Sequence, residues 1–467
     1  MKREELEPNT VEKESEPTES GWSRRAFLGS AALAGAVIAS CTSEPTREIP
    51  HYGRTRMLAG PQQAPDGPIL KAGLVGCGGR GTGAAFDFLN AGPNLQLAAL
   101  ADVFDDHLQQ CRNQLKERKG VEIPDDRCFL GFDAFQRVID SDVDVVLLAT
   151  PPYFRPEHFE AAVQARKQVF MEKPVAVDPV GSRAILASAE KADAFGLCVV
   201  TGTQRRHERS YIETYNRIVD GAIGEIVAAR CYWNQGQLWY KVRESGWTDM
   251  EAMLRDWVNW QWLSGDHIVE QHIHNIDVVN WYTGLHPVRA VGAGARMRRV
   301  TGDQYDFFSV DFAMENGLHV HSMCRQIDGC VNSVSEAVQG TLGSSNCKDT
   351  IFDLDGNVVW SYKDDQEKAK ARAEEAGEEW QGDNSPYLQE HVDLVTAIRT
   401  GAKINEAHDT AASTLVAIMG RISAYTGLET TWDEMMASDL TVGPRELRMG
   451  PVDLQAEIPV PGVPTRA

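Results

Sequence analysis

Cysteine is scarce in this sequence and follows no pattern. Only 9 of the 467 residues are cysteines, and no two of them stand in a C-x-x-C pair or at the spacing of a zinc-binding motif. The sequence therefore gives no sign of a zinc module, and buried thiols are the expected state. Cys324 and Cys330 are near enough in sequence to pair if the final compartment is oxidising.

Basic residues are outnumbered by acidic ones. The chain has 46 Lys and Arg against 67 Asp and Glu, which gives a formal net charge of −21. A surface with this excess of negative charge repels nucleic acid and anionic membrane faces. We therefore expect neither as a partner, and because acidic balance is common among soluble enzymes it predicts no substrate.

The apolar stretch near the N-terminus is too short to span a bilayer as a stable helix. Residues 29–40 are rich in alanine and follow Arg24 and Arg25, an arrangement typical of a twin-arginine export signal. Cys41 comes directly after an Ile-Ala-Ser sequence that resembles a lipoprotein processing site, and an ordinary cleavage region without lipid is the alternative. We predict a signal over residues 1–40 and localisation in the periplasm or cell envelope, with a lipid on Cys41 as the only membrane attachment.

Export constrains how a cofactor is used. Twin-arginine substrates cross the membrane already folded, so an exported enzyme can carry its cofactor with it. Outside the cytoplasm there is no free nicotinamide pool, so such a cofactor has to be retained and returned to its starting redox state in each cycle. Residues 41–69, rich in proline, glycine and polar side chains, predict a linker that precedes the first domain.

A glycine-rich turn follows the first predicted strand, which begins at residue 70. Gly76, Gly78 and Gly81 form a G-x-G-x-x-G motif, and Asp102 closes the next apolar run. In such a motif the first glycine permits a tight turn, the second lets the backbone approach a pyrophosphate, and the third lets the helix pack close to the sheet. Asp102 is placed to accept a hydrogen bond from a ribose 2′-hydroxyl and would repel a phosphate there. The sequence therefore favours NAD over NADP.

Strand and helix alternate through the first half of the chain, as in a doubly wound parallel sheet of the Rossmann type. An apolar strand over residues 143–149 ends at Thr150 and Pro151, and a second over residues 168–171 ends at Glu-Lys-Pro. Ligands bind beyond the carboxyl ends of parallel strands. We therefore predict an NAD-binding domain over residues 70–201. Its candidate cofactor-binding residues are Gly76, Gly78, Gly79, Arg80, Gly81, Asp102, Thr150, Pro151, Glu172 and Lys173.

The ordered set of motifs resembles the glucose–fructose oxidoreductase, inositol dehydrogenase and rhizopine-catabolism (Gfo/Idh/MocA) family. After the glycine motif come D-V-D-V-V-L-L-A-T-P, E-K-P at residues 172–174, and G-A-I-G-E-I at residues 221–226. The resemblance runs from about Lys71 to about Gly427. It implies a C-terminal α+β domain over residues 202–430, with a large open, mostly antiparallel sheet that often makes dimer or tetramer contacts. We therefore expect a homo-oligomer, and residues 431–467 carry no chemical signal and predict a tail.

A second segment, residues 265–277, concentrates polar side chains. Read as one helix, it places His267, Glu270, His274 and Asp277 on a single face. The family has an Asp, a His four residues later and an Asp three beyond. These positions match Glu270, His274 and Asp277, so a Glu replaces the first Asp, and Ser-Gly-Asp stands where the family commonly has three glycines. Both departures concern the expected substrate pocket.

Oxidation of a secondary alcohol with NAD requires a base that takes the hydroxyl proton. Imidazole has a pKa near the working pH, so we assign this role to His274. The resemblance assigns to Lys173 the stabilisation of developing alkoxide charge. Glu270 would orient His274 or bind a sugar hydroxyl. The candidate substrate-binding residues are Gln204, Arg206 and Asp277, although ordinary salt bridges explain the arginine almost as well.

A metal site is the alternative interpretation of that helix face, because two histidines and two carboxylates can ligate zinc or manganese. Lys173 already supplies the positive charge that such a site would provide, and we predict no metal. The leading hypothesis is an exported NAD-dependent oxidoreductase that acts on a sugar, polyol or sugar acid. The alternatives are a redox-neutral glycoside hydrolase or lyase that oxidises the ring transiently, and a sugar-binding protein without turnover, against which Lys173 and His274 argue.

Overall fold

The computed structural model describes residues 54–454 and 457–463. The predicted signal, Cys41 and residues 42–53 of the predicted linker lie outside the described residues, so export and lipidation stay predictions. Within the described part, no helix combines the length and the apolar character needed to cross a membrane. Cys324 is buried and Cys330 is exposed, and both are free thiols, so the suggested pair is not formed.

The first domain is built on a six-stranded parallel sheet with the order β3-β2-β1-β4-β5-β6. The chain moves outward from β1 through β2 to β3, then returns to β4 on the other side of β1, which is the doubly wound arrangement predicted from the sequence. All four residues of β4 are buried, because helices cover both faces of the sheet. Its strands are β1 (Leu70–Val75), β2 (Leu95–Asp102), β3 (Cys128–Leu130), β4 (Val145–Leu148), β5 (Gln168–Met171) and β6 (Val199–Thr201). Its helices are α2 (Gly79–Asn90), α3 (Asp105–Lys119), α4 (Ala134–Ile139), α5 (Arg155–Gln164) and α6 (Pro179–Phe195).

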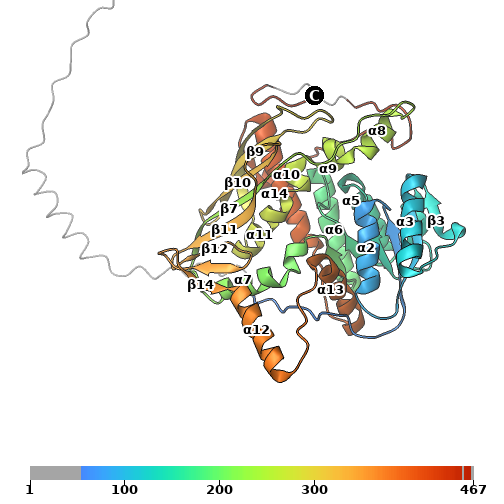
Figure 1. Ribbon diagram of the computed structural model, residues 1–467. Helices are drawn as coiled ribbons and strands as arrows, with labels where there is room; N and C mark the ends of the chain where they lie inside the picture. Colours follow the sequence, from blue (N-terminus) through green and yellow to red (C-terminus); the bar gives the residue numbers. More distant parts are fainter. Residues whose placement is uncertain (1–53, 455–456, 464–467) are drawn as a thin grey trace, which may run out of the picture. The chain divides into compact units, whose positions relative to one another are not determined.

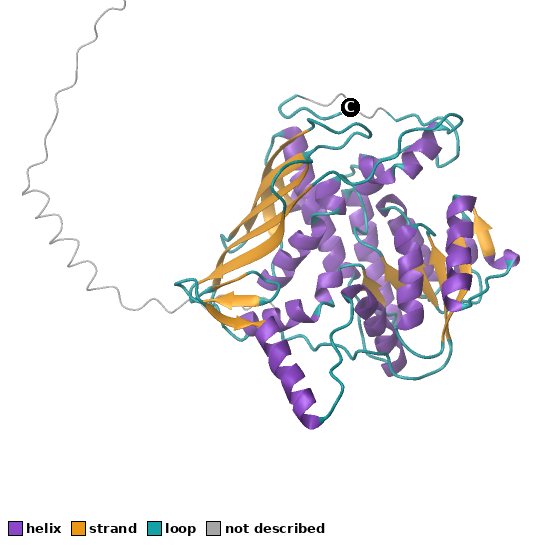
Figure 2. Ribbon diagram, viewed as in Figure 1, coloured by secondary structure: helices purple, strands orange, loops and turns teal. Residues whose placement is uncertain are grey.

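The second domain contains a nine-stranded sheet with the order β14-β13-β12-β11-β7-β10-β9-β8-β15. Neighbouring strands are antiparallel except for β7 and β10, which pair in parallel. The α/β fold class and the large, mostly antiparallel second sheet are thus confirmed (Figure 2). Its strands are β7 (Ile226–Gln235), β8 (Pro287–Ala295), β9 (Phe307–Met314), β10 (His319–Gln326), β11 (Ser333–Gly340), β12 (Ser344–Ser345), β13 (Thr350–Phe352), β14 (Val358–Ser361) and β15 (Thr430–Thr431). Its helices include α7 (Arg209–Val219), α8 (Asp249–Arg255), α9 (Gln261–Ser264), α10 (His267–Glu270), α11 (Ile273–Thr283) and α12 (Tyr362–Ala376).

Two late helices tie the domains together. In α13 (Pro386–Thr400), Val392, Leu394 and Val395 are fully buried in the core of the first domain. The next helix, α14 (Ala407–Thr426), packs on both α6 and β8 and lies between the two sheets (Figure 1). The first domain is therefore completed by residues far along the chain from its parallel strands.

The described residues beyond Thr426 include a strand and a helix, although the sequence predicts a tail without chemical signal from residue 431. β15 adds to the edge of the second sheet beside β8, and the helix α15 (Trp432–Ala437) begins with a capping box formed by Thr431 and Glu434. Residues 439–454, which we call the tail, then cross both domains. Val442, Leu447, Val452 and Leu454 pack on a buried cluster that contains Met250 and Trp262.

Candidate functional site

The glycine turn has the geometry that a nucleotide site requires. Gly76 has φ +97°, and a Cβ there would lie 2.7 Å from the carbonyl carbon of Ala149. A Cβ on Gly81 would lie 1.8 Å from the Gly76 oxygen, so this glycine is what lets α2 approach β1. Around Gly78, in contrast, nothing lies within 4 Å of the Cβ position. The turn is thus tightly packed against the protein backbone at Gly76 and Gly81 and open at Gly78.

The N-terminus of α2 faces this open space without a side-chain cap. Gly78 is the N-cap residue, and no acidic residue stands in the first turn. The backbone N–H groups of the first turn therefore remain available, and together with the helix dipole they favour a bound anion. These residues fit the pyrophosphate of NAD, which Gly76, Gly78, Gly79 and Gly81 would hold.

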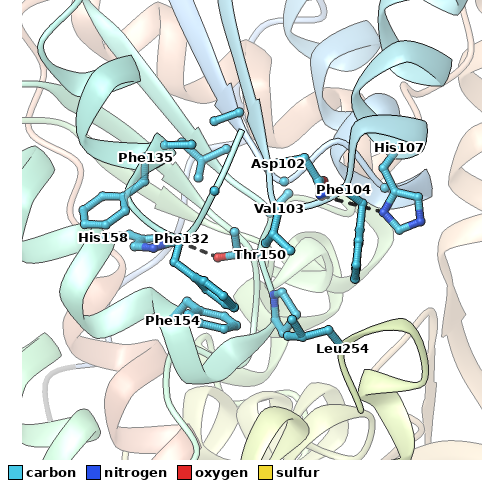
Figure 3. A pocket seen from close by; sticks show the side chains of 18 of the residues that line it. Asp102, Val103, Phe104, His107, Phe132, Phe135, Thr150, Phe154, His158 and Leu254 are labelled. Carbon is cyan, nitrogen blue, oxygen red and sulfur yellow. Dashed lines mark hydrogen bonds and ion pairs between the residues drawn. The ribbon is translucent and has the colours of Figure 1, made fainter. Parts of the chain in front are cut away.

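Asp102 ends β2 beside the glycine turn. Its Oδ2 accepts a hydrogen bond from the Cys77 N–H at 2.7 Å, and its Oδ1 accepts one from the Phe104 N–H at 2.9 Å. Burial raises the pKa of this carboxyl, while those two backbone N–H groups oppose the shift. His107 lies 3.8 Å away (Figure 3). Asp102 therefore shapes the turn and borders the space where a ribose would lie.

A cavity of about 110 Å³ opens beside Asp102. It is bordered by the glycine turn and by Thr150 and Pro151 at the end of β4. Its apolar walls suit the planar base of a nucleotide. The Thr150 hydroxyl and His158 Nδ1 share a hydrogen bond at 3.3 Å (Figure 3). The aromatic and apolar side chains that line the cavity include Phe104, Phe132, Phe135, Phe154, Leu254 and Trp257.

Lys173 follows β5 and reaches across to the second domain. Its buried Nζ donates to the backbone oxygen of Glu270 at 2.5 Å and to the Glu270 carboxylate at 3.0 Å. The peptide bond between Lys173 and Pro174 is cis. The structure thus brings together two of the three predicted catalytic residues, with the ammonium held by an anionic partner.

Arg80 and Glu172 form an ion pair. The Arg80 guanidinium donates to the Glu172 carboxylate and lies 3.3 Å from Asp87 and 3.4 Å from Glu390. The predicted cofactor-binding role of these two residues is therefore indirect. They link the glycine turn to the segment that carries Lys173.

His274 does not share one continuous helix face with His267, and that part of the sequence prediction is wrong. The segment breaks after Glu270 into α10 and α11, because the Glu270 carbonyl accepts from Lys173 and the His274 N–H turns to Gln271 at 3.3 Å. His267 instead pairs with Asp266 at 2.9 Å. Among residues 54–454 and 457–463, no group of three potential metal ligands is close enough to hold an ion.

The His274 imidazole is buried and stacks on Trp233, with ring centroids 5.5 Å apart and planes 25° from parallel. Its Nδ1 has no hydrogen-bond partner among the described residues. Burial, assisted by the positive charges of Lys173 and Arg205, holds the pKa of His274 well below its ordinary value. The ring is therefore neutral at pH 7, and the same surroundings make it a weaker base than a free imidazole.

The three predicted substrate-binding residues divide into two groups. Arg206 donates to both oxygens of Asp277 at 2.8 and 3.0 Å, and the Ser413 hydroxyl also donates to Asp277 at 2.9 Å. The acceptors of Asp277 are thus taken, and this buried pair has the geometry of a structural salt bridge rather than that of a free substrate contact. Gln204 differs, since its buried Oε1 has no partner in the described structure and can accept from a ligand.

Glu336, the partner of Arg205, and the second-domain wall of the cavity were not predicted from the sequence. Arg205 donates to the buried Glu336 and lies 5.5 Å from the Trp233 ring, and Glu336 accepts from Asn275 at 2.7 Å. This network lies behind His274. Leu254 and Trp257, which form the second-domain wall of the cavity, lie in residues 232–262, a region rich in tryptophan and tyrosine. The aromatic composition of that region was the only signal in the sequence.

Comparisons with known proteins agree with this geometry. Residues 70–200 match a model described as an oxidoreductase family with an NAD-binding Rossmann fold. Residues 211–345 match the GFO/IDH/MocA C-terminal domain. The chain belongs to the Gfo/Idh/MocA family. Its first domain is the NAD-binding Rossmann domain of that family, which confirms the predicted fold and cofactor.

Curated relatives of this Gfo/Idh/MocA protein include inositol 2-dehydrogenase of Acidothermus cellulolyticus, 27% identical over 240 residues, which are 51% of this chain and 60% of the relative. Another is scyllo-inositol 2-dehydrogenase (NAD(+)) of Bacillus subtilis, 23% identical over 50% of this chain and 60% of the relative. The chain thus spans about 60% of the length of these relatives.

Solved structures share the fold. Scyllo-inositol dehydrogenase from Lactobacillus casei, with bound NAD(H) and scyllo-inositol, has a TM-score of 0.57 at 20% identity and covers 79% of this chain and 100% of its own. Aldose-aldose oxidoreductase from Caulobacter crescentus, complexed with glycerol, has a TM-score of 0.59 at 19% identity over 78% of this chain and 99% of its own. At such identities the likeness concerns the fold alone.

Proposed function

We propose that this protein is an NAD-dependent oxidoreductase that oxidises a secondary alcohol of a polyol, most closely one of the inositol type. The observation that carries the proposal is the placement of Lys173. Its ammonium lies at the carboxyl end of a Rossmann strand, held by Glu270, within the electrostatic reach of the neutral His274. The names of the relatives that act on inositols support the polyol class.

Each residue has a role that follows from its chemistry. When bound, NAD supplies the ring that accepts a hydride from the substrate carbon. His274, which is neutral, would take the hydroxyl proton. Lys173 stabilises the negative charge that develops on the oxygen, and Glu270 fixes the position of the ammonium. Gln204, with its free acceptor, would bind a further substrate hydroxyl.

The proposal is tested by supplying purified protein with NAD and a panel of inositols, alditols and aldoses, and following NADH by absorbance. We expect turnover with at least one polyol. Lys173→Met should lower kcat by about 10²- to 10⁴-fold while the Kd for NAD stays within about threefold. Lys191→Met is the matched control, because Lys191 is an exposed lysine paired with Glu160 on the same domain, and it should keep full activity.

Two results would contradict the assignment. Full turnover by Lys173→Met would remove the proposed mechanism. Cleavage of aryl glycosides without added NAD and without net NADH would instead favour the redox-neutral glycosidase.

We also propose that the enzyme acts outside the cytoplasm and forms a homo-oligomer. Export is supported by Arg24 and Arg25 ahead of an alanine-rich stretch, and oligomerisation by the exposed second sheet that the family resemblance assigns to such contacts. Fractionation of cells that express the protein, compared with an Arg24→Lys and Arg25→Lys double variant, tests the first. Light scattering of the purified enzyme tests the second.

A further inference from the structure

The turn that precedes α10 departs both from ordinary backbone geometry and from the family pattern. Asp266 stands at the third of the positions where the family commonly has glycine, and it has φ +71° and ψ 162°. Glycine adopts this conformation readily, whereas a residue with a side chain keeps it only where the surrounding structure holds it in place. Asp266 is completely buried, so the contacts of its side chain have to hold the turn.

The Asp266 carboxylate binds donors from three separate parts of the chain. Its Oδ1 accepts from the His267 N–H at 2.6 Å and lies 2.9 Å from His267 Nδ1. Its Oδ2 accepts from the Tyr305 N–H at 2.9 Å and from the Tyr425 hydroxyl at 2.5 Å. Tyr305 lies just before β9, and Tyr425 lies in α14. Four hydrogen bonds to one buried carboxylate fix both its position and the start of α10.

A second anchor holds the same turn. The guanidinium of Arg421, a buried residue of α14, donates to the Gly265 carbonyl at 2.8 Å. Gly265 has φ +82° and directly precedes Asp266. Arg421 and Tyr425 lie one turn apart on α14, the helix that packs on both α6 and β8. The turn is therefore fixed to a helix that contacts both domains.

The helix α10 connects Asp266 to Lys173. It has only four residues, His267–Glu270, and the Glu270 N–H donates to the Asp266 carbonyl at 2.9 Å. At the far end of the same helix, the Glu270 carbonyl and carboxylate both accept from the Lys173 ammonium, the carboxylate at 3.0 Å. A single helical turn thus lies between the buried carboxylate and the ammonium.

We propose that Asp266 is a positioning residue for the Lys173 ammonium. Its carboxylate holds α10 in place, and α10 carries the Glu270 groups that set where the ammonium lies relative to His274. A glycine at this position would allow the same backbone conformation but would supply none of the four hydrogen bonds. The inference rests on the proposed function, because it assumes that Lys173 and His274 act on the same substrate. Asp266 acts only through Glu270 and is not itself a catalytic residue.

The test combines Asp266→Gly with Lys173→Met in a double-mutant cycle. Asp266→Gly allows the backbone conformation and removes the carboxylate, so kcat for the polyol should fall by about 10²-fold, with little change in the Kd for NAD. In protein that already carries Lys173→Met, the same substitution should change kcat by no more than about twofold, because no ammonium is left to position. Equal losses in the two backgrounds would overturn the proposal, since they would show a structural effect that is independent of Lys173.

The pKa of His274, followed by NMR titration of its ring, gives a readout that does not need turnover. Burial, together with Lys173 and Arg205, lowers this pKa. Displacement of the ammonium should therefore raise it, whereas loss of a carboxylate charge by itself would lower it. An upward shift in Asp266→Gly supports the proposal, and an unchanged or lower pKa overturns it. If the wild-type enzyme turns over no polyol, the proposed function fails, and the titration still decides the role of Asp266.

Should Asp266→Gly fail to fold, Asp266→Asn takes its place, and Asp256→Asn is the matched control. Asp256 is also buried, and its carboxylate accepts from the Lys241 N–H at 2.7 Å and from the Asn259 side chain at 2.8 Å, neither of which belongs to α10. Both asparagine variants keep the volume of the side chain and lose its charge. We expect kcat to fall by about tenfold and the pKa of His274 to rise in Asp266→Asn only. Equal effects in the two variants would overturn the proposal.

Discussion

At the scale of single residues, burial and the neighbouring positive charges decide the protonation state of His274. Burial is the largest influence on its pKa, and Lys173 and Arg205 then lower that pKa further. Glu270 is nearby, but its carboxylate accepts a hydrogen bond from Lys173 and is paired with that ammonium. The imidazole is thus kept as a neutral proton acceptor by its surroundings and not by a carboxylate partner.

This arrangement predicts that Lys173→Met raises the pKa of His274. Removal of the neighbouring ammonium takes away a repulsion of the imidazolium, so the pKa moves upward but stays below its ordinary value of about 6.5 because burial remains. The measurement is an NMR titration of the His274 ring in both proteins. Lys191→Met should leave the titration unchanged, and a downward shift in Lys173→Met would contradict the electrostatic explanation.

Asp102 predicts the choice of nucleotide. Asp102→Asn keeps an oxygen for one of the two backbone N–H groups but removes the charge that repels a 2′-phosphate. We expect the ratio of Kd values for NADP and NAD to fall by about tenfold or more. Calorimetric titration with both nucleotides measures it, and an unchanged ratio would show that the carboxylate does not face the ribose.

At the scale of elements, the close packing of α2 on β1 depends on one glycine. A methyl group on Gly81 would overlap the Gly76 carbonyl oxygen. That oxygen belongs to the backbone, so it cannot move away as the end of a flexible side chain could. Gly79, also at the start of α2, has open space in the corresponding direction. Alanine substitutions at these two positions therefore distinguish the effect of packing from the effect of helix propensity.

Gly81→Ala should lower the free energy of unfolding by about 3 kcal/mol and weaken NAD binding, because α2 has to move away from the sheet. Gly79→Ala should leave the stability unchanged or slightly raised, since alanine favours the helix. Urea denaturation of the two variants gives the comparison. Equal stabilities would mean that the turn relaxes without moving the helix.

The sequence predicted elements well where local signals were sufficient. The sequence predicts helices over residues 105–119, 179–195 and 386–400, and α3, α6 and α13 have these bounds. Charged and apolar periodicity, an N-terminal proline or a C-terminal glycine marks the ends of each helix. The helix expected over residues 265–277 failed for a reason that is not local. The carbonyl of Glu270 is used by Lys173, which lies 97 residues earlier in the chain, and no periodicity reveals such a contact.

At the scale of the whole molecule, buried histidines make stability depend on pH. Burial lowers the pKa of His158 and of His272 to about 3, and it also lowers the pKa values of His274 and His391. His207 differs, because Glu406 and Asp393 outweigh its burial and raise its pKa. Folding thus keeps these four imidazoles neutral, and burial also lowers the pKa of a fifth, His267, although Asp266 opposes the shift.

The protein should lose stability as the pH falls from 7 to 5. Below about 6.5 the unfolded chain protonates these four histidines and the folded chain does not, which costs about 1.4 kcal/mol per pH unit for each fully unprotonated group. His207 acts in the opposite sense only above about 6.5, where its contribution is lost as the pH rises. Urea midpoints at a series of pH values measure the effect.

His391→Leu provides a control for this prediction. Neither ring nitrogen of His391 has a hydrogen-bond partner in the described structure, so leucine removes the titration without breaking a bond. The slope of stability against pH should become shallower in this variant. An identical slope would mean that acid sensitivity comes from other groups.

The candidate site was predictable in its Rossmann half and less so in the rest. Gly76, Gly81 and Asp102 follow from a continuous motif, whereas the pairing of Arg206 with Asp277 joins residues 71 positions apart. The contacts of Leu254 and Trp257 with the cavity, and of α13 with the core of the first domain, also join residues far apart in the sequence. Composition marked the aromatic region but not its position.

The order in which the chain is made gives the tail a further consequence. The ribosome synthesises the parallel strands and residues 249–264 long before it reaches Val442 and Val452. The N–H groups of these two valines donate to Asp178 and Asp249. A nascent chain therefore lacks these contacts between the tail and the rest of the protein for a period during translation.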